Sequence, residues 1–469
     1  MNRLISSLPL KCVGGSFIPL KGAWGSMREE KLFSGIHIAG TALALAFTMV
    51  MAVVYYIKLA PIYPEPNRQR TVYFNMIEVH LEKDGKARGT NGFCFSEKAF
   101  EEWFLPSKNY EYCAPTHLST GRGRILSYDN ECAVKGKEEY IEAITNYTNA
   151  DFFKIYQYDF LEGRPLTEQD VENRENVCVV SHDFAERYFG RDVSAVGKTV
   201  ETENHEAVRV VGVVRGTSSL TPDSHIQVFK PYTLRQSEHS NIPYCGSLGI
   251  VLTVKDGKQL QALKRELDEI AARLTQSDAI HTDILMEEGT TKTVQLTNSM
   301  ETHPMHTLRN ECSNGSLLED VSTWQVVKHY AGLLFVLLFV PALNLCGIVA
   351  GRMERRTAEM AVRKTFGARR STLLRQVIME NLVLTGIGGL IGLVVAWLSI
   401  YAFRTELLGL FFDSSAVGSS PIVTGEMLFA PLLFVGAFLA ILIINLLSAL
   451  LPAWLSLRKP IVESMMEKR

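Results

Sequence analysis

Hydrophobic and charged residues are strongly segregated along this chain of 469 residues. A transmembrane helix needs about 20 mostly apolar residues, and four stretches without any Asp, Glu, Lys or Arg exceed that length. They are Leu32–Ile57 with 26 residues, His329–Gly351 with 23, Asn381–Phe403 with 23 and Met427–Leu457 with 31. The pattern predicts an α-helical membrane protein with four transmembrane helices, at residues 35–57, 329–351, 380–403 and 428–451.

Charges beside these stretches predict the orientation, because positively charged loops stay in the cytoplasm. Arg28 and Lys31 place the N-terminal segment, residues 1–34, inside. The basic tail, residues 452–469, is also cytoplasmic. Residues 58–328 then form an extracytoplasmic domain of 271 residues, which is large enough for its own core, and residues 404–427 form a short outer loop.

The large domain between the first and second spans has the pattern of a mixed α+β fold. The segment Thr71–His80 predicts a strand, residues 175–180 predict a buried strand, and Lys198–Val214 predicts a hairpin with its turn near Asn204. Apolar residues at helical spacing predict an amphipathic helix over residues 260–274 that packs on a sheet.

A strongly basic segment separates the second and third spans. From Arg352 to Arg375 there are eight Lys or Arg against two acids, a formal charge of +6. Apolar residues recur at helical spacing, and Gly367-Ala368 supplies a turn. Residues 352–379 are therefore predicted to form a cytoplasmic helical hairpin that joins two membrane helices.

Several strings resemble a known family. The segment ERRTAEMAVRKTFGARRSTLLRQVIMENL, residues 354–382, is similar to the signature of MacB-like and FtsX-like permeases of ABC transporters. The ending with Pro452, Ala453 and Pro460 resembles the closing motif of that family. Residues 151–214 resemble the extracytoplasmic core domain of MacB-like permeases.

The resemblance implies the permease subunit of an ABC transporter in the bacterial cytoplasmic (inner) membrane. Its implied partners are a separate ABC ATPase subunit, a second permease copy or a paralogue, membrane lipid and a periplasmic adaptor protein. ATP hydrolysis by the partner would move the outer domain and drive export or extraction of an extracytoplasmic substrate. The hairpin that takes this push would comprise Arg352, Glu354, Arg355, Arg356, Glu359, Arg363, Lys364, Gly367, Ala368, Arg369, Arg370, Arg375 and Glu380.

Two other functions remain open at this point. One is an FtsX-like membrane-anchored regulator that activates a cell-wall hydrolase or acts as a sensor and transports nothing. The other is a membrane-tethered enzyme. Neighbouring reading frames for an ATPase and a membrane-fusion adaptor would favour export, whereas a neighbouring hydrolase would favour regulation.

Motifs for chemistry within the chain are weak. Gly197-Lys198-Thr199 lacks the earlier glycine of a phosphate loop, since position 192 is Asp, so no nucleotide site is predicted here. No cofactor and no catalytic residue are predicted either. His303, His306 and Cys312 suggest ordinary surface polarity rather than a metal site. A net charge of −2 and a pI near 6.6 give no reason to expect nucleic acid as a partner.

Within the spans, Gly388 and Gly392 form a small-xxx-small face that allows close helix approach, although glycine is generally enriched in membrane helices. Asn344 is the most polar residue of the second span and should find a partner helix or its own backbone. Within the four uncharged stretches the only candidate proton carriers are His37 and His329, both near the ends, which argues against a proton-coupled carrier.

Cysteines and the N-terminus leave alternatives. Six cysteines fall in the outer domain, so their disulfide pairing cannot be deduced; a bridge among Cys94, Cys113 and Cys132 is one interpretation, and Cys178 is expected as a packed thiol. Met27 begins a sequence typical of the family, so residues 1–26 are either an upstream extension or an interfacial segment.

Overall fold

The chain divides into two compact units. A helical unit comprises Met1–Val53, Tyr330–Ala402 and Ala430–Arg469, and a domain unit comprises Val54–His329 and Phe403–Phe429. The computed structural model describes residues 31–74, 76–84, 86–117, 134–135, 140–141, 143–201, 207–218, 220–234, 243–277, 290–296, 300–312, 321–333, 335–336, 339, 346–347, 350–351, 362–363, 365–403 and 431–458.

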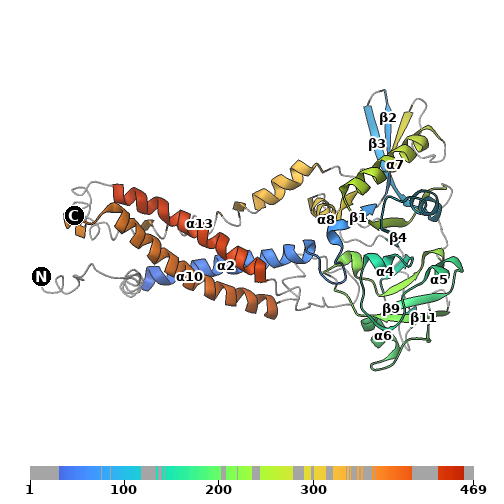
Figure 1. Cartoon of the computed structure of the whole chain (residues 1–469), viewed down its shortest axis with the longest axis horizontal. Helices are drawn as coiled ribbons and strands as arrows, with labels where there is room; N and C mark the ends of the chain where they lie inside the picture. Colours follow the sequence, from blue (N-terminus) through green and yellow to red (C-terminus); the bar gives the residue numbers. More distant parts are fainter. Residues whose placement is uncertain are drawn as a thin grey trace. The chain divides into compact units, whose positions relative to one another are not determined.

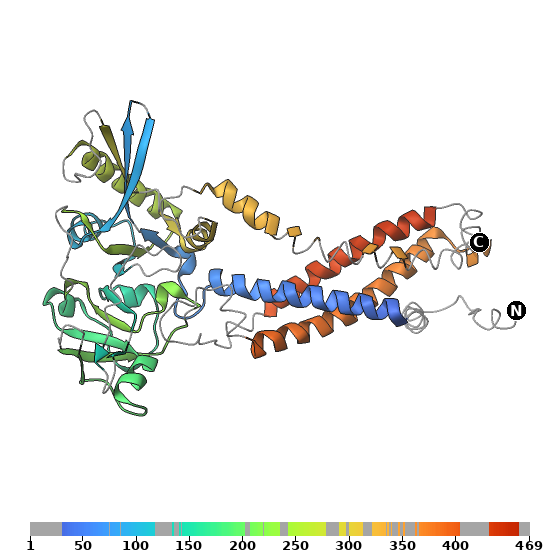
Figure 2. The same cartoon turned by 180° about the vertical axis from the view of Figure 1, so that it is seen from behind.

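Three long helices run alongside one another in the helical unit (Figures 1 and 2). They are α2 (Lys31–Leu59), whose last turn belongs to the domain unit, α10 (Arg370–Ala402) and α13 (Pro431–Arg458). By length and composition α2 and α10 could cross a membrane, and α13 contains a shorter apolar segment, Phe434–Leu450. Of the 23 residues of the predicted second span, 11 lie outside the described residues. Four spans therefore remain a prediction.

The described part of the domain unit contains two main sheets. The first has the order β15-β2-β3-β14-β1-β16, with β13 added to β3 and β4 added to β14. Its strands are β1 (Thr71–Phe74), β2 (Ile77–Lys83), β3 (Lys86–Phe95), β4 (Tyr112–His117), β13 (Cys245–Gly246), β14 (Leu248–Thr253), β15 (Thr290–Gln295) and β16 (Glu301–Thr302). We call this sheet and its helices the first lobe.

The second sheet has the order β10-β11-β9-β12-β7, with β8 paired to β11, and forms the second lobe. A separate two-stranded sheet pairs β5 (Val134–Lys135) with β6 (Tyr140–Ile141). The strands of the second lobe are β7 (Thr145–Thr148), β8 (Phe160–Gly163), β9 (Val177–Ser181), β10 (Thr199–Glu201), β11 (Ala207–Val214) and β12 (Val228–Pro231).

Shorter helices cover both lobes. They are α3 (Glu97–Ala99), α4 (Phe152–Ile155), α5 (Glu168–Glu172), α6 (His182–Phe189), α7 (Gly257–Gln276) and α8 (His303–Cys312), with a π-helical turn at Phe100–Phe104 and 3₁₀ turns at Arg68–Arg70, Pro222–Ser224 and Tyr232–Leu234.

Most elements predicted for the domain are present. The amphipathic helix is α7, which buries Leu263 and Leu267 in the core of the first lobe, and the Asp256 side chain caps its N-terminus by accepting from Gln259 N. The predicted hairpin is β10 and β11, paired antiparallel, and its expected turn at Asn204 lies outside the described residues. The buried strand is β9.

One predicted strand is wrong. The segment Thr71–His80 forms two strands, β1 and β2, which are not neighbours in the first sheet, because β3 and β14 lie between them. The sequence pattern shows only that residues alternate, whereas the pairing of β1 with β14 and β16 depends on segments far along the chain.

The two lobes share a hydrophobic core. Tyr73 and Val251 of the first sheet are buried together with Phe152, Val177 and Phe229 of the second lobe. This shared core fixes the lobes against each other at the level of β1, the strand that follows the end of α2.

Candidate functional sites

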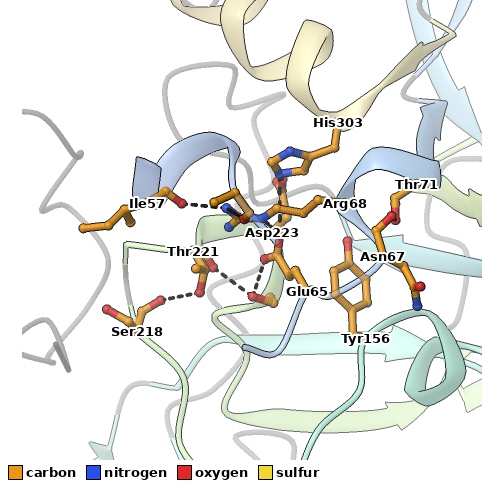
Figure 3. A network of polar contacts seen from close by, with 12 residues as sticks. Ile57, Glu65, Asn67, Arg68, Thr71, Tyr156, Ser218, Thr221, Asp223 and His303 are labelled. Carbon is orange, nitrogen blue, oxygen red and sulfur yellow. Dashed lines mark hydrogen bonds and ion pairs between the residues drawn. The ribbon is translucent and has the colours of Figure 1, made fainter. Parts of the chain in front are cut away.

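A buried cluster of charged side chains lies where the chain leaves α2 and enters the domain (Figure 3). Arg68, in the 3₁₀ turn before β1, donates from Nε to Glu65 Oε2 over 2.6 Å. Both side chains are only 2% exposed, so the pair is almost completely removed from water. The same Glu65 carboxylate accepts a hydrogen bond from Ser224 Oγ of the second lobe.

The Arg68 guanidinium also closes the end of α2. Its Nη1 donates to the carbonyl oxygens of Ile57 over 2.6 Å and Ala60 over 2.8 Å. The last carbonyls of a helix lack hydrogen-bond partners within the helix and carry partial negative charge. A cation there donates hydrogen bonds to them and also balances that charge. One side chain thus joins the end of α2 to Glu65.

The N-terminal part of α8 completes the cluster. His303 Nε2 lies 3.5 Å from Glu65 Oε2 and 3.5 Å from Asp223 Oδ2, and the imidazole is 3% exposed. Burial acts to raise the pKa of Asp223, but the hydrogen bond and charge of His303 outweigh it and hold that pKa below its ordinary value. We name Glu65, Arg68, Asp223 and His303 the ionic junction.

Aromatic side chains pack against the junction from both lobes. The ring of His306 stacks on Tyr73 of β1 with 4.9 Å between centroids, and the Tyr73 hydroxyl lies 3.0 Å from that of Tyr156. Burial lowers the pKa of His306 to about 4 and raises the pKa of both tyrosines. His306 is therefore neutral near pH 7.

The interpretation of His303 and His306 as surface polarity is wrong, because both are buried at 2% and 6% exposure. Cys312, at the far end of α8, is partly exposed. Among the described residues no three His, Cys, Asp or Glu are grouped so that they could hold a metal ion. The sequence signal for their burial was present in the spacing of His303 and His306 on one helical face.

Two of the three cysteines considered for a bridge, Cys94 in β3 and Cys113 in β4, are buried. Cys132 lies outside the described residues, so a bridge among these three stays a prediction. Burial, with a smaller effect of Asp151, raises the pKa of the Cys113 thiol. Cys178 is fully buried in β9, as expected for a packed thiol.

Only part of the predicted coupling hairpin belongs to the described residues; Arg352, Glu354, Arg355, Arg356, Glu359 and Lys364 lie outside them. Gly367 has a φ of +89°, which glycine adopts without strain. Ala368 N donates to Arg363 O over 3.0 Å, the bond that ends a helix at a left-handed glycine. The helix α10 begins at Arg370, three residues after Gly367.

A chain of side chains connects the two arms of this turn. Arg363 Nη1 donates to Gln376 Oε1 over 2.9 Å, and Gln376 Nε2 donates to Glu380 Oε1 over 3.1 Å. Glu380 is 3% exposed, whereas Phe366 at the tip of the turn is 81% exposed. The described cations Arg363, Arg369, Arg370 and Arg375 are all exposed, so the tip presents positive charge around one apolar ring.

Glycines of α10 lie against both neighbouring helices. A Cβ built on Gly388 would lie 2.9 Å from Ile38 O, and one on Gly392 would lie 2.6 Å from Ala42 O, both on α2. Gly389 faces Phe438 of α13 in the same way. The later glycine of α10 meets the later residue of α2, so α2 and α10 run parallel. Asn344, also expected in helix packing, lies outside the described residues.

The helical unit also buries uncharged polar side chains, which we name the bundle polar layer. They are Ser34 and Thr41 on α2, Asn381 and Thr385 on α10, and Asn445 on α13. Asn381 Nδ2 donates to Val377 O over 2.9 Å. Within the described residues, Ser34 Oγ, Thr41 Oγ1, Thr385 Oγ1 and Asn445 Nδ2 have no hydrogen-bond partner.

The surface of the helical unit is apolar. Large side chains such as Phe47 of α2, Leu390 of α10 and Leu439 of α13 are at least half exposed. A soluble protein would bury such rings and aliphatic chains, whereas hydrocarbon solvates them. The fold therefore defines a class: a helical membrane protein that carries a large mixed α/β domain after its first long helix.

Comparison with known proteins places the chain within that class. Residues 34–270 match the MacB-like periplasmic core domain, and residues 331–461 match the FtsX-like permease C-terminal domain. The first match alone covers more than half of the chain. The protein belongs to the MacB/FtsX-like family of ABC transporter permeases, which are membrane permeases with a periplasmic domain.

Individual relatives are distant. The chain is 23% identical over 301 residues to the uncharacterized ABC transporter permease YknZ of Bacillus subtilis, covering 62% of this chain and 68% of that protein. It is 21% identical over 448 residues to the macrolide export ATP-binding/permease protein MacB of Escherichia coli K12. That alignment covers 94% of this chain but only 59% of MacB.

A solved structure of the periplasmic region of MacB from Actinobacillus actinomycetemcomitans is also similar, at 15% identity and a TM-score of 0.32. The match covers 48% of this chain and 89% of that one. At this level of similarity it adds nothing to the assignment.

Proposed function

We propose that this protein is the membrane-spanning subunit of an ABC transporter whose ATPase is a separate polypeptide. The observation that carries the proposal is the order of the two family matches, a periplasmic core domain followed by an FtsX-like permease domain in one chain. The subunit couples ATP hydrolysis to movement of its outer domain and thereby exports or extracts a substrate that is already outside the cytoplasm.

The direction of the helices supports the proposed topology. Four spans with both termini in the cytoplasm require the first and third spans to run the same way and the fourth to run the opposite way. The contacts of Gly388 and Gly392 make α2 and α10 parallel. Gly389 meets Phe438, whereas Val377 meets Ala449, so α10 and α13 are antiparallel.

The tip of the turn at Gly367 is the proposed docking site for the ATPase. Its exposed cations provide the charge, and Phe366, which is 81% exposed, provides an apolar anchor. Aromatic residues and Arg are enriched in protein–protein interfaces, and a few anchor residues carry most of the binding energy. The Arg363–Gln376–Glu380 chain would pass a push on the tip into α10.

Co-purification of this chain with a co-expressed candidate ATPase subunit tests the proposal. Replacing both Arg363 and Lys364 by Glu should abolish association with the ATPase, because negative charges replace the docking cations. Insertion into the membrane should be unaffected. Phe366→Ser should weaken association by about 2 kcal/mol or more, as expected for an interface anchor. Arg70→Glu, a charge reversal in the outer domain, is the matched control and should leave binding unchanged.

Two outcomes would contradict the proposal. If the wild-type chain retains no ATPase in mild detergent, the transporter assignment fails. If the wild type binds and the Arg363/Lys364 double variant binds equally well, the docking site lies elsewhere on the chain.

A further inference from the structure

The ionic junction lies where four parts of the domain unit meet. Arg68 contacts the last turn of α2, Glu65 contacts Ser224 of the second lobe, and His303 brings in α8 (Figure 3). The first lobe begins immediately afterwards, with β1 at Thr71.

A second ion pair ties the other end of α8 to α2. Lys58, in the last turn of α2, forms a salt bridge with Glu311, in the last turn of α8. The helix α8 is therefore held at both ends, through His303 to the junction and through Glu311 to α2. This matters because the chain continues from α8 toward the predicted second span.

The segment between α2 and the 3₁₀ turn is also bound to the second lobe by two further hydrogen bonds. Gln157 N donates to Pro64 O over 2.9 Å, and Asn67 Nδ2 donates to Ile155 O over 3.2 Å. These bonds lie on either side of Glu65. The segment cannot swing freely, so a displacement of the end of α2 must be taken up by the second lobe.

We propose that Glu65 and Arg68 are positioning residues that make the end of the first span, the second lobe and α8 move together. This inference rests on the proposed function, because it concerns how movement driven by the ATPase reaches the outer domain. Arg68 is suited to the role, since one planar guanidinium bonds Glu65, Ile57 O and Ala60 O at the same time.

The alternative is that the pair contributes only to folding. Removing one member leaves a buried charge without its partner and destabilises a protein, so a single substitution cannot separate the two roles. The double variant Glu65→Gln with Arg68→Met removes both charges together and keeps similar side-chain volumes. It deletes the bonds to Ile57 O and Ala60 O without leaving an unpaired charge at either position.

Movement of the second lobe can be measured by electron paramagnetic resonance. A spin-labelled noncanonical amino acid at Leu161, which is 52% exposed on β8, reports the separation of two copies of this chain, the second copy being one of the partners that the resemblance implies. The full chain is reconstituted with its ATPase in nanodiscs, and distances are compared between the nucleotide-free and the vanadate-trapped state.

The wild type should show a shift in this distance on trapping. The double variant should bind the ATPase and hydrolyse ATP with a thermal midpoint much closer to the wild type than that of Arg68→Met, but lose the shift, and Arg68→Lys should lose part of the shift. Arg70→Met is the control, because Arg70 lies in the same turn but is 45% exposed and bonds Glu111. In Arg70→Met the distance between the labels should change on trapping as it does in the wild type.

The outcomes separate the inference from the proposed function. A double variant that shifts as fully as the wild type overturns the role of Glu65 and Arg68 while the transporter assignment stands. A wild type that neither binds the ATPase nor shifts on trapping overturns the proposed function itself. A loss of the shift in Arg70→Met as well would overturn the specific role of Arg68.

Discussion

The ionic junction and the bundle polar layer are two buried polar clusters built from different chemistry. In the junction every contact involves a charged or ionisable group, and the single carboxylate of Glu65 contacts Arg68, His303 and Ser224. In the polar layer the groups are neutral, and several of the described ones lack a hydrogen-bond partner. One cluster lies in the domain unit and the other in the helical unit.

The difference concerns how freely each cluster can rearrange. Separating buried opposite charges is costly, so the junction holds a single arrangement. Interhelical hydrogen bonds between neutral groups in a membrane are worth only about 0.6 kcal/mol on average, so the polar layer can gain or lose such a bond at little cost. A stiff connection at the domain and an adjustable helical unit together suit a protein that transmits movement.

The largest expected effect is at the junction. Arg68→Met alone leaves Glu65 buried without its main cation and should lower the free energy of unfolding by about 3–5 kcal/mol. Adding Glu65→Gln should recover most of that loss. Thermal unfolding of the full chain in detergent measures both, and equal destabilisation by the single and the double variant would contradict a charge-balanced cluster.

Acid should weaken the packing around the junction through His306. Unfolded His306 binds a proton below pH about 6.5, whereas the buried ring does so only below about 4. The unfolded state therefore binds more protons between these values, and stability falls as the pH falls through that window, by about 3 kcal/mol in total. Asp223, His303 and Tyr73 face the ring.

His306→Phe keeps the stacking on Tyr73 but cannot titrate. Its thermal midpoint should fall less than that of the wild type when the pH is lowered from 6.5 to 4. Since all other groups titrate in both proteins, the difference isolates His306. Parallel pH profiles of the two proteins would show that His306 does not contribute.

Helix packing in the helical unit should respond less strongly. A methyl group at Gly392 would meet Ala42 O at 2.6 Å, so Gly392→Ala should push α2 and α10 apart and cost about 1–3 kcal/mol. Gly386→Ala is the matched control, because nothing lies within 4 Å of the added Cβ. If both variants unfold at the same temperature in detergent, the contact between α2 and α10 is looser than described.

The smallest effect is expected in the polar layer. Asn445→Leu removes a buried amide whose Nδ2 has no partner among the described residues, so stability should change by less than about 1 kcal/mol or rise slightly. The same type of change at the junction is strongly destabilising. A large loss of stability in Asn445→Leu would remove the contrast between the two clusters.

Local patterns predict much of this fold. The helix α7 follows from its apolar spacing, and the hairpin of β10 and β11 follows from residues that are close in the chain. The long apolar helices α2 and α10, which could cross a membrane, follow from long uncharged runs. In each case the information lies within a window of about 30 residues or fewer, which periodicity can detect.

The ionic junction is a different case. Its members Glu65, Asp223 and His303 come from segments more than 70 residues apart, and each looks like an ordinary polar residue in its own surroundings. Only the pairing of β1 with β14 and β16 brings α8 to Arg68. Glu65, between Pro64 and Pro66, and Arg68 three residues later were the available signal just after α2, and this signal was too weak to indicate burial.

The account depends most on the basic turn and the mixed α/β domain lying on opposite sides of the membrane. Cysteine substitutions at Arg363 and Leu161, both exposed, can be labelled in intact cells with a membrane-impermeant maleimide, using the parent chain to subtract native thiols. We predict that Leu161→Cys reacts in intact cells and that Arg363→Cys reacts only after permeabilisation. Labelling of Arg363→Cys from outside would contradict the account.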